Sequence, residues 1–164
     1  MYSKILVPVD GSDAATCGLA EAIKMAKEQG GRLRLLHIVK PPFLDYGYSK
    51  ADLSRKQVIA VLYESGKRIL SRAEALVREQ GLNPECLMFE SIDGPVATLI
   101  LDQAKEWSAD LIVLGTHPRG GLIGIGSDLA EVLSLSPVPL LLVRATQMSI
   151  TTPEHRALEY PCAA

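Results

Sequence analysis

Short apolar runs alternate with longer helical patterns along most of the chain. The clearest runs are Lys4–Val9, Leu33–Val39 and Leu111–Leu114, which are rich in Ile, Leu and Val and show no regular polar alternation. Continuous runs of this kind are typical of strands that are buried on both faces. Because strands that alternate with helices form a parallel sheet with helices on both faces, the chain is predicted to adopt an α/β fold.

Turn and capping residues set the expected ends of these elements. Asp10-Gly11-Ser12-Asp13 is expected to start the first helix, Gly30-Gly31 to end it, and Gly94-Pro95 to start the third helix with proline in its first turn. Gly66 is a candidate kink in the long second helix. The expected strands are Lys4–Val9, Leu33–Val39, Glu85–Ser91, Leu111–Leu114 and Leu140–Val143, and the expected helices are Ala14–Gln29, Ala51–Gln80, a helix through Val96–Ala104, and Asp128–Ser134.

A glycine-rich segment, Gly115–Ser127, separates the fourth strand from the helix that begins at Asp128. Glycines allow backbone N–H groups to approach an anion closely, and a helix start adds unpaired donors and the positive end of its dipole. A strand, this segment and a helix in that order predict a phosphate site. The alternative is a turn or lid without a ligand. The segment contains neither a Walker sequence nor a dinucleotide fingerprint.

Asp10 follows the first strand as the glycine-rich segment follows the fourth. Ligands of open parallel sheets bind outside the carboxyl ends of the strands, where the strand order reverses. Asp10 and the segment are therefore expected to border one crevice, although Asp10 has an alternative role as a cap of the turn at Gly11-Ser12. His37 lies within an apolar strand and is interpreted as a buried, hydrogen-bonded core residue.

Composition excludes several classes of partner. A formal net charge of -2 over 164 residues gives no basic face for DNA or RNA. No apolar run approaches the roughly 20 residues that cross a bilayer, and Met1–Asp10 lacks the pattern of a signal peptide. Cys17, Cys86 and Cys162 suggest neither a disulfide framework nor a metal motif. A cytoplasmic protein without nucleic-acid or membrane partners is expected.

The residues at the strand ends resemble the universal stress protein family. The likeness rests on Val7-Pro8-Val9-Asp10-Gly11-Ser12, on Asp110–Ser127 and on Val138–Val143, and it spans about Lys4 to Arg144. It implies a universal stress protein domain at residues 1–145 with the adenine-nucleotide alpha-hydrolase-like fold, an open five-stranded parallel sheet of strand order 3-2-1-4-5. Residues 146–164 are expected to be a C-terminal tail that is mobile or docked on a partner.

The same resemblance implies a site for ATP, or for the related AMP or ADP. It would place the adenosine beside Pro8, Val9 and Asp10, with the Asp10 carboxylate near the ribose or Mg²⁺ and Val39 against the base. The phosphates would follow the glycine-rich segment, where the helix start and Arg119 offer hydrogen bonds to an anion. The residues of this segment expected at the nucleotide are Gly115, Thr116, His117, Arg119, Gly120, Gly121, Gly126 and Ser127.

A second function stays open from the sequence. ATP-binding members of the family carry Gly, two residues, Gly, nine residues, and then Gly-Ser or Gly-Thr. Here Pro118 replaces the second glycine, and the stretch to Gly126 is two residues shorter. The alternative is a family member that binds no nucleotide and acts as a dimeric interaction or scaffold protein. Since no residue is indicated as a catalytic base, any enzymatic activity is expected to be at most a weak ATPase.

The last strand is the expected site of self-association. A strand at Val138–Val143 would lie at an edge of the sheet and would leave backbone groups unpaired, which invites pairing with a second copy. The resemblance points to the same strand as a dimer contact. A homodimer through this strand is predicted, together with a protein partner whose identity the sequence does not give.

Overall fold

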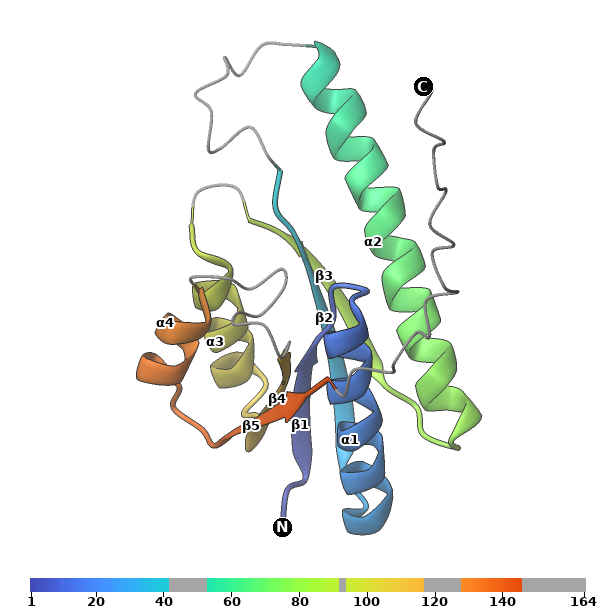
Figure 1. Ribbon diagram of the computed structural model, residues 1–164, viewed down its shortest axis with the longest axis vertical. Coiled ribbons are helices and arrows are strands. Elements are labelled where there is room, and N and C mark those ends of the chain that lie inside the picture. The colour runs from blue at the N-terminus through green and yellow to red at the C-terminus, as the bar shows by residue number, and fades with distance from the viewer. Residues whose placement is uncertain (42–52, 92–93, 117–127, 146–164) are drawn as a thin grey trace, which may run out of the picture.

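The computed structural model describes residues 1–41, 53–91, 94–116 and 128–145. These residues form a five-stranded sheet with the order β3-β2-β1-β4-β5, in which neighbouring strands pair in parallel (Figure 1). The predicted α/β class and strand order are therefore confirmed. The elements are β1 (Lys4–Pro8), α1 (Asp13–Gln29), β2 (Arg32–Val39), α2 (Leu53–Glu79), β3 (Glu85–Glu90), α3 (Val96–Glu106), β4 (Leu111–Thr116), α4 (Asp128–Leu135) and β5 (Leu140–Arg144).

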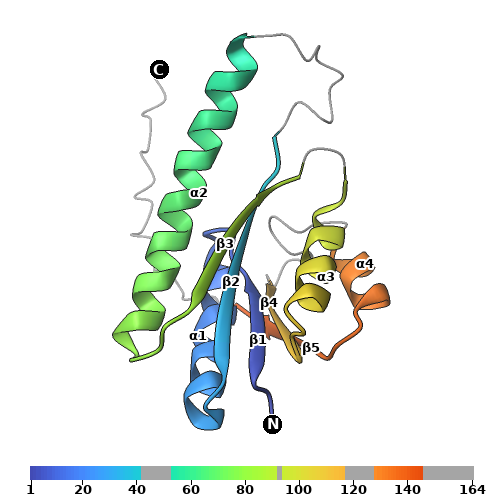
Figure 2. The same cartoon turned by 180° about the vertical axis from the view of Figure 1, so that it is seen from behind.

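The helices cover both faces of the sheet in pairs. Helices α1 and α2 lie on one face, and α3 and α4 lie on the other (Figure 1 and Figure 2). Successive side chains of a strand point to opposite faces, so Ile5 and Val7 of β1 pack with α1 and α2, whereas Leu6 packs with α3. All three side chains are at most 1% exposed. Burial on both faces explains why the strands read as continuous apolar runs.

The first helix begins and ends at the expected capping residues. Ser12 is the N-cap of α1, and its hydroxyl accepts a hydrogen bond from the Ala15 N–H at 3.1 Å. Gly30 ends the helix in the left-handed conformation, with φ of 66°. In α3 the expectation is off by one position, because Pro95 is the N-cap, with an extended ψ of 142°, and the first helical residue is Val96.

Gly66 has a packing role inside α2, which is one continuous helix from Leu53 to Glu79. A β-carbon at Gly66 would lie 2.7 Å from Cδ2 of His37 and 2.8 Å from Sδ of Met88. Real β-carbons do not approach other atoms so closely, so the glycine lets α2 pack directly on β2 and β3. The helix continues through the position where a kink was expected, and the glycine is explained by the close approach of α2 to the sheet.

The edge strand β5 begins at Leu140, the residue expected for the fifth strand, and ends at Arg144. The wider range Val138–Val143, given for the dimer contact, begins two residues before the strand does. Pro139 has no N–H for a strand ladder, although its carbonyl accepts a hydrogen bond from the Ile112 N–H at 3.1 Å. The position of β5 at the edge of the sheet is as expected. Among the helices of the described ranges, none combines the length and apolar character needed to cross a bilayer.

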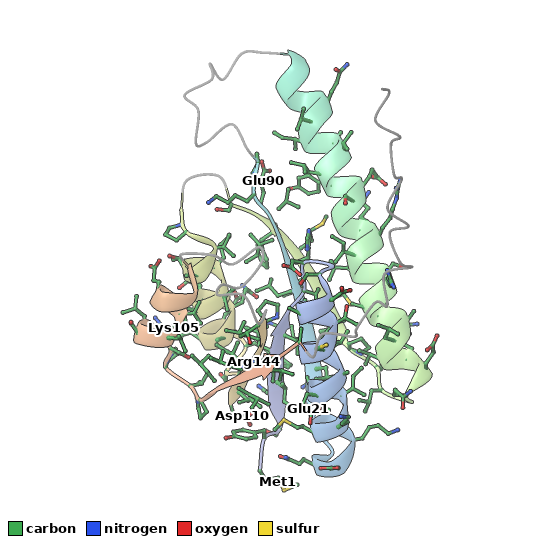
Figure 3. All side chains as sticks on the ribbon, viewed as in Figure 1. Met1, Glu21, Glu90, Lys105, Asp110 and Arg144 are labelled. Atoms are coloured by element: carbon green, nitrogen blue, oxygen red, sulfur yellow. The ribbon has the colours of Figure 1, made fainter. Side chains whose placement is uncertain are left out.

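Side chains at the amino ends of the strands tie the sheet to itself. Asp110, just before β4, accepts hydrogen bonds from the Ser3 N–H at 2.8 Å, the Ser3 hydroxyl at 2.7 Å and the Lys4 N–H at 2.9 Å. Burial acts to raise the pKa of Asp110, but these hydrogen bonds outweigh it and hold the pKa below its ordinary value. Figure 3 shows Asp110 at the same end of the molecule as Met1, far from Glu90 at the other end of the sheet.

Arginines on β2 reinforce the same amino end. The Arg34 guanidinium lies 2.6 Å from the Glu85 carboxylate of β3, and Arg32 pairs with the same carboxylate. The hydrogen bond from Arg34 is the largest of the causes that lower the pKa of Glu85. Arg34 also lies over the ring of Trp107, with 4.5 Å between the guanidinium carbon and the ring centroid. The beginnings of β2 and β3 are thereby held together by charge as well as by the ladder.

Candidate functional site

A cavity opens at the carboxyl ends of β1, β2 and β4, and we call it the switch-point cavity. The strand order reverses here, because β1 has β2, the next strand in sequence, on one side and β4 on the other. The cavity has a volume of about 60 Å³ and brings together four of the predicted site residues, Pro8, Val9, Asp10 and Gly115. The described residues that line it are Pro8, Val9, Asp10, Ser12, Ala15, Leu36, Ile38, Lys40, Val96, Ile100 and Gly115.

The turn after β1 fixes the position of Asp10. Oδ1 of Asp10 accepts a hydrogen bond from the Ser12 N–H at 2.9 Å, and Gly11 between them has a φ of 82°, in the region that favours glycine. Asp10 therefore does cap the turn, as the alternative interpretation held. In the described part of the chain no hydrogen bond reaches Oδ2, so the half-buried carboxylate keeps one oxygen for a ligand.

Gly115 lines the cavity, but backbone packing already explains why it is a glycine. A β-carbon at Gly115 would overlap the carbonyl group of Ala14 in the first turn of α1. The contact is mutual, since a β-carbon at Gly18, one turn further along α1, would lie 2.9 Å from the Gly115 backbone nitrogen. The end of β4 and the start of α1 thus touch backbone to backbone, which brings the α1 N-terminus to the cavity.

Two predicted site residues are described but do not line the cavity. Val39 is 3% exposed, and its carbonyl accepts a hydrogen bond from the Ser91 N–H at 2.9 Å. Its neighbours Ile38 and Lys40 line the cavity instead, because successive side chains of a strand point to opposite faces. The hydroxyl of Thr116 donates to the Val143 carbonyl at 3.4 Å and so faces β5.

The remaining predicted site residues lie outside the described ranges. They are His117, Arg119, Gly120, Gly121, Gly126 and Ser127. Helix α4 begins at Asp128, the expected residue. The part of the predicted phosphate path that the structure describes therefore consists of the end of β4 alone.

Sequence reasoning missed Lys40 and the contribution of α3. Lys40 follows β2 as Asp10 follows β1, so both charged residues reach the same end of the sheet. The sequence could have indicated Lys40, because a charged residue directly after a buried strand lies at the carboxyl edge of the sheet. Val96 and Ile100 of α3 complete the apolar wall, and no local pattern distinguishes them from other core residues.

His37 supports the floor of this region from the opposite face. It is 8% exposed, and its Nδ1 lies 2.7 Å from the carbonyl oxygen of Val9. The interpretation of His37 as a buried, hydrogen-bonded core residue is confirmed. Its bond fixes the backbone of Val9 directly before Asp10.

Metal binding by protein groups alone finds no support in the described residues, where no group of three or more His, Cys, Asp and Glu side chains comes together. Asp10 supplies one carboxylate. Mg²⁺ is commonly held by one or two carboxylates together with phosphate oxygens and water. Asp10 therefore fits a magnesium ion that arrives with a phosphate ligand.

Comparison with known proteins gives a consistent result. The sequence model described as the universal stress protein family matches residues 1–144. A universal stress protein of Methanocaldococcus jannaschii is 31% identical over 147 residues, which cover 88% of this chain and 83% of the relative. One of Bacillus subtilis is 30% identical, with 88% of this chain and all of the relative covered.

Solved structures agree with the sequence relatives. A universal stress protein family member from Burkholderia pseudomallei has a TM-score of 0.71 at 27% identity and covers 87% of this chain and 96% of its own. Two more distant neighbours share the fold. One is a universal stress protein in complex with cAMP, with a TM-score of 0.59 at 19% identity over 88% of this chain and 98% of its own. The other, from Archaeoglobus fulgidus, is in complex with dAMP, with a TM-score of 0.61 at 24% identity over 87% of this chain and 98% of its own.

Proposed function

The chain belongs to the universal stress protein family, and from this membership we propose that it binds an adenine nucleotide at the mouth of the switch-point cavity as part of a stress response. The observation that carries the proposal is the convergence of Asp10 and Lys40 on one apolar cavity at the point where the strand order reverses. The proposed function is therefore nucleotide binding.

The chemistry of the lining suits a purine nucleoside monophosphate or a longer phosphate chain. Ile38, Val96 and Ile100 offer apolar contact to a base, the free oxygen of Asp10 can accept a hydrogen bond from a ribose hydroxyl, and Lys40 offers a positive charge to phosphate. The cAMP and dAMP bound by two neighbours in fold share the adenine and a single phosphate, which supports adenine over other bases. ATP, ADP and AMP are all candidates.

The phosphates are proposed to extend from Gly115 along the glycine-rich segment. The proposed phosphate contacts along this segment are Thr116, His117, Arg119, Gly120, Gly121, Gly126 and Ser127. Val39 is still proposed as a contact of the base. Mg²⁺ is proposed to bridge Asp10 and phosphate oxygens when a di- or triphosphate is bound. The cytoplasmic location predicted from the sequence also stays a prediction.

Titration with nucleotides tests this proposal. AMP, and ATP with Mg²⁺, are expected to give saturable heats in isothermal titration and to shift the methyl resonances of Ile38 and Ile100 in the cavity. The Ile69 methyl, on the other face of the sheet, serves as the internal control, and GMP serves as the control ligand. The proposal would be excluded if millimolar nucleotide gave no binding heat and left the methyl resonances of Ile38 and Ile100 unmoved.

A second candidate function is a dimeric interaction protein that binds no nucleotide. The sequence observations that favour it are Pro118 and the shortened segment before Gly126. The structural one is the open edge of β5, where Leu142 is 42% exposed. A homodimer through β5 and the preceding Val138 is compatible with either function, and it is proposed here for both, as is an unidentified protein partner.

Light scattering separates the dimer from the nucleotide question. Leu142→Lys is expected to convert a dimer to a monomer, because a charge would be buried at the paired edge. Val61→Lys, at an apolar α2 position that is 69% exposed, is the matched control and is expected to stay dimeric. A monomeric wild-type protein at micromolar concentration would exclude the dimer.

A further inference from the structure

A second cavity, about 200 Å³ in volume, lies between α1 and α2, and we call it the α1–α2 cavity. Its inner wall is apolar, with Val9 and Leu19 at 5% and 2% exposure and with Ile69 and Leu76 from α2. This wall belongs to the core on the α1 and α2 face, whereas Ile100 and Leu36 of the switch-point cavity belong to the opposite core. An apolar cavity of about 150 Å³ can bind benzene, so this one has room for a small apolar body.

Two arginines of α2, Arg68 and Arg72, line the open side of this cavity. They are four residues apart and therefore project from one face of the helix, where like charges repel. Two other basic residues of α2 are paired, Lys67 with Glu64 at 2.7 Å and Arg78 with Glu74 at 2.7 Å. Neither Arg68 nor Arg72 forms a salt bridge within the residues the structure describes. The exposed Ser65 adds a hydroxyl to the same rim.

We propose that the α1–α2 cavity binds a small amphiphilic anion, with its apolar body against Leu19 and Leu76 and its carboxylate or phosphate head on Arg68 and Arg72. Guanidinium groups form paired, charge-assisted hydrogen bonds with carboxylate and phosphate oxygens, and a shared anion removes the repulsion between the two arginines. The apolar wall supplies the remaining binding energy by burying hydrocarbon surface.

Both halves of the ligand are required by the lining. An inorganic anion would leave the apolar wall without a partner, and a neutral hydrocarbon would leave the two guanidinium groups without an anion in the cavity. The cavity volume of about 200 Å³ exceeds the roughly 150 Å³ that holds a benzene ring, so an alkyl chain of medium length is a suitable body. The site is separate from the proposed nucleotide site, although Val9 and Ala15 line both cavities.

Octyl phosphate is the probe, and the methyl groups of three isoleucines report where it binds. The Ile69 methyl resonance is expected to shift saturably, while those of Ile38 and Ile100 in the switch-point cavity stay in place. Octanoate tests whether a carboxylate head serves as well as a phosphate. Inorganic phosphate carries only the anionic head and 1-octanol only the alkyl chain. Each is expected to bind at least about tenfold more weakly than octyl phosphate.

Variants assign the head group to the arginines. Arg68→Gln with Arg72→Gln is expected to weaken octyl phosphate binding about tenfold or more, because both charged hydrogen-bond donors are lost. Both side chains are exposed, so the melting temperature is expected to stay close to that of the wild type. Lys67→Gln removes the same charge from the neighbouring residue, which does not line the cavity, and is expected to leave the affinity unchanged.

Three results would overturn the proposal. They are unchanged affinity in the double arginine variant, equal binding of 1-octanol and octyl phosphate, and shifts of Ile38 and Ile100 without Ile69. AMP is titrated into the same labelled protein. If AMP shifts the Ile38 and Ile100 resonances while octyl phosphate leaves Ile69 unmoved, the α1–α2 site is refuted and the nucleotide site is supported. If octyl phosphate shifts Ile69 while AMP leaves Ile38 and Ile100 unmoved, the nucleotide site is refuted and the α1–α2 site is supported.

Discussion

Polar side chains at the amino ends of the strands bond to one another, whereas Asp10 and Lys40 at the carboxyl ends line the switch-point cavity. At the amino ends, Asp110 accepts three hydrogen bonds from Ser3 and Lys4, and Arg34 pairs with Glu85. At the carboxyl ends, Asp10 makes one local hydrogen bond and leaves an oxygen free. Asp110, Arg34 and Glu85 thus hold one end of the sheet together, whereas Asp10 keeps an oxygen available at the other.

The direction of the chain explains this division. In a parallel sheet every strand enters at the same end, and every helix that follows a strand starts near the carboxyl end. The N-terminus of α1, with the positive end of its dipole, therefore lies beside the switch-point cavity. Four substitutions test the division, in order of decreasing expected effect.

Gly115→Ala tests whether the carboxyl end also contains an essential structural contact. The added β-carbon would overlap the Ala14 carbonyl, and the free energy of unfolding is expected to fall by about 3 kcal/mol or more. Chemical denaturation measures the change. Gly94→Ala is the control, since a β-carbon there meets nothing within 4 Å, and a change within about 0.5 kcal/mol is expected. Equal losses in both variants would contradict the packing explanation.

Asp110→Ala tests the cohesion of the amino end. Loss of the bonds from Ser3 and Lys4 is expected to lower the free energy of unfolding by about 2 kcal/mol without changing nucleotide affinity. Asp102→Ala, at an exposed position of α3, is the control. If Asp110→Ala weakened AMP binding as strongly as it lowered stability, the two ends would not be separable.

The pH dependence of the same variant has a fixed sign. The folded-state pKa of Asp110 is lowered, so its contribution is fully present above the ordinary value of 3.8 and is lost as the pH falls below 3.8 through the folded pKa. The difference in unfolding free energy between wild type and Asp110→Ala is therefore expected to shrink in that acidic range. A difference that stays constant from neutral pH into this range would show that the carboxylate charge is not the cause.

Asp10→Asn tests the availability of polar groups at the carboxyl end. The amide oxygen can still accept the Ser12 hydrogen bond, so the melting temperature is expected to change little. AMP affinity is expected to fall about tenfold, because a charged acceptor near the ribose is lost. Asp13→Asn, an exposed carboxylate in the first turn of α1, is the control. Equal affinity in Asp10→Asn and wild type would remove Asp10 from the site.

Lys40→Gln is expected to have the smallest effect. Lys40 is exposed, so water and salt screen its attraction to phosphate, and AMP affinity is expected to fall about threefold at low salt and less at high salt. Lys24→Gln, on the outer surface of α1, is the control and is expected to bind normally. A loss that is independent of salt would indicate that Lys40 acts by contact with the base or the sugar.

Most of the fold could be predicted because it depends on local patterns. Apolar runs, the Ser12 cap and the Gly30 stop each act within one element, and they gave nearly all ends to within two residues. The strand order required the family resemblance, since periodicity does not say which strands are neighbours. The start of β5 at Leu140 was correct, whereas the range given for the dimer contact included Pro139, which cannot join the ladder.

The site was predicted less completely because it depends on which face a side chain occupies. Ile38 and Lys40 line the cavity where Val39 was expected, a difference of one residue that changes the face of the sheet. Lys40 and the wall from α3 become neighbours of Asp10 only in the assembled sheet. The α1–α2 cavity had no signal in the sequence, because Arg68 and Arg72 read as an ordinary solvated helix surface.

The contact between Gly115 and Ala14 has a consequence for how motifs of this kind are used. Any side chain at this position would separate strand β4 from helix α1, so selection for folding alone suffices to retain the glycine after a lineage has given up its ligand. The first glycine of the motif therefore diagnoses ancestry of the scaffold, and evidence of nucleotide use must be sought at residues whose identity folding leaves free.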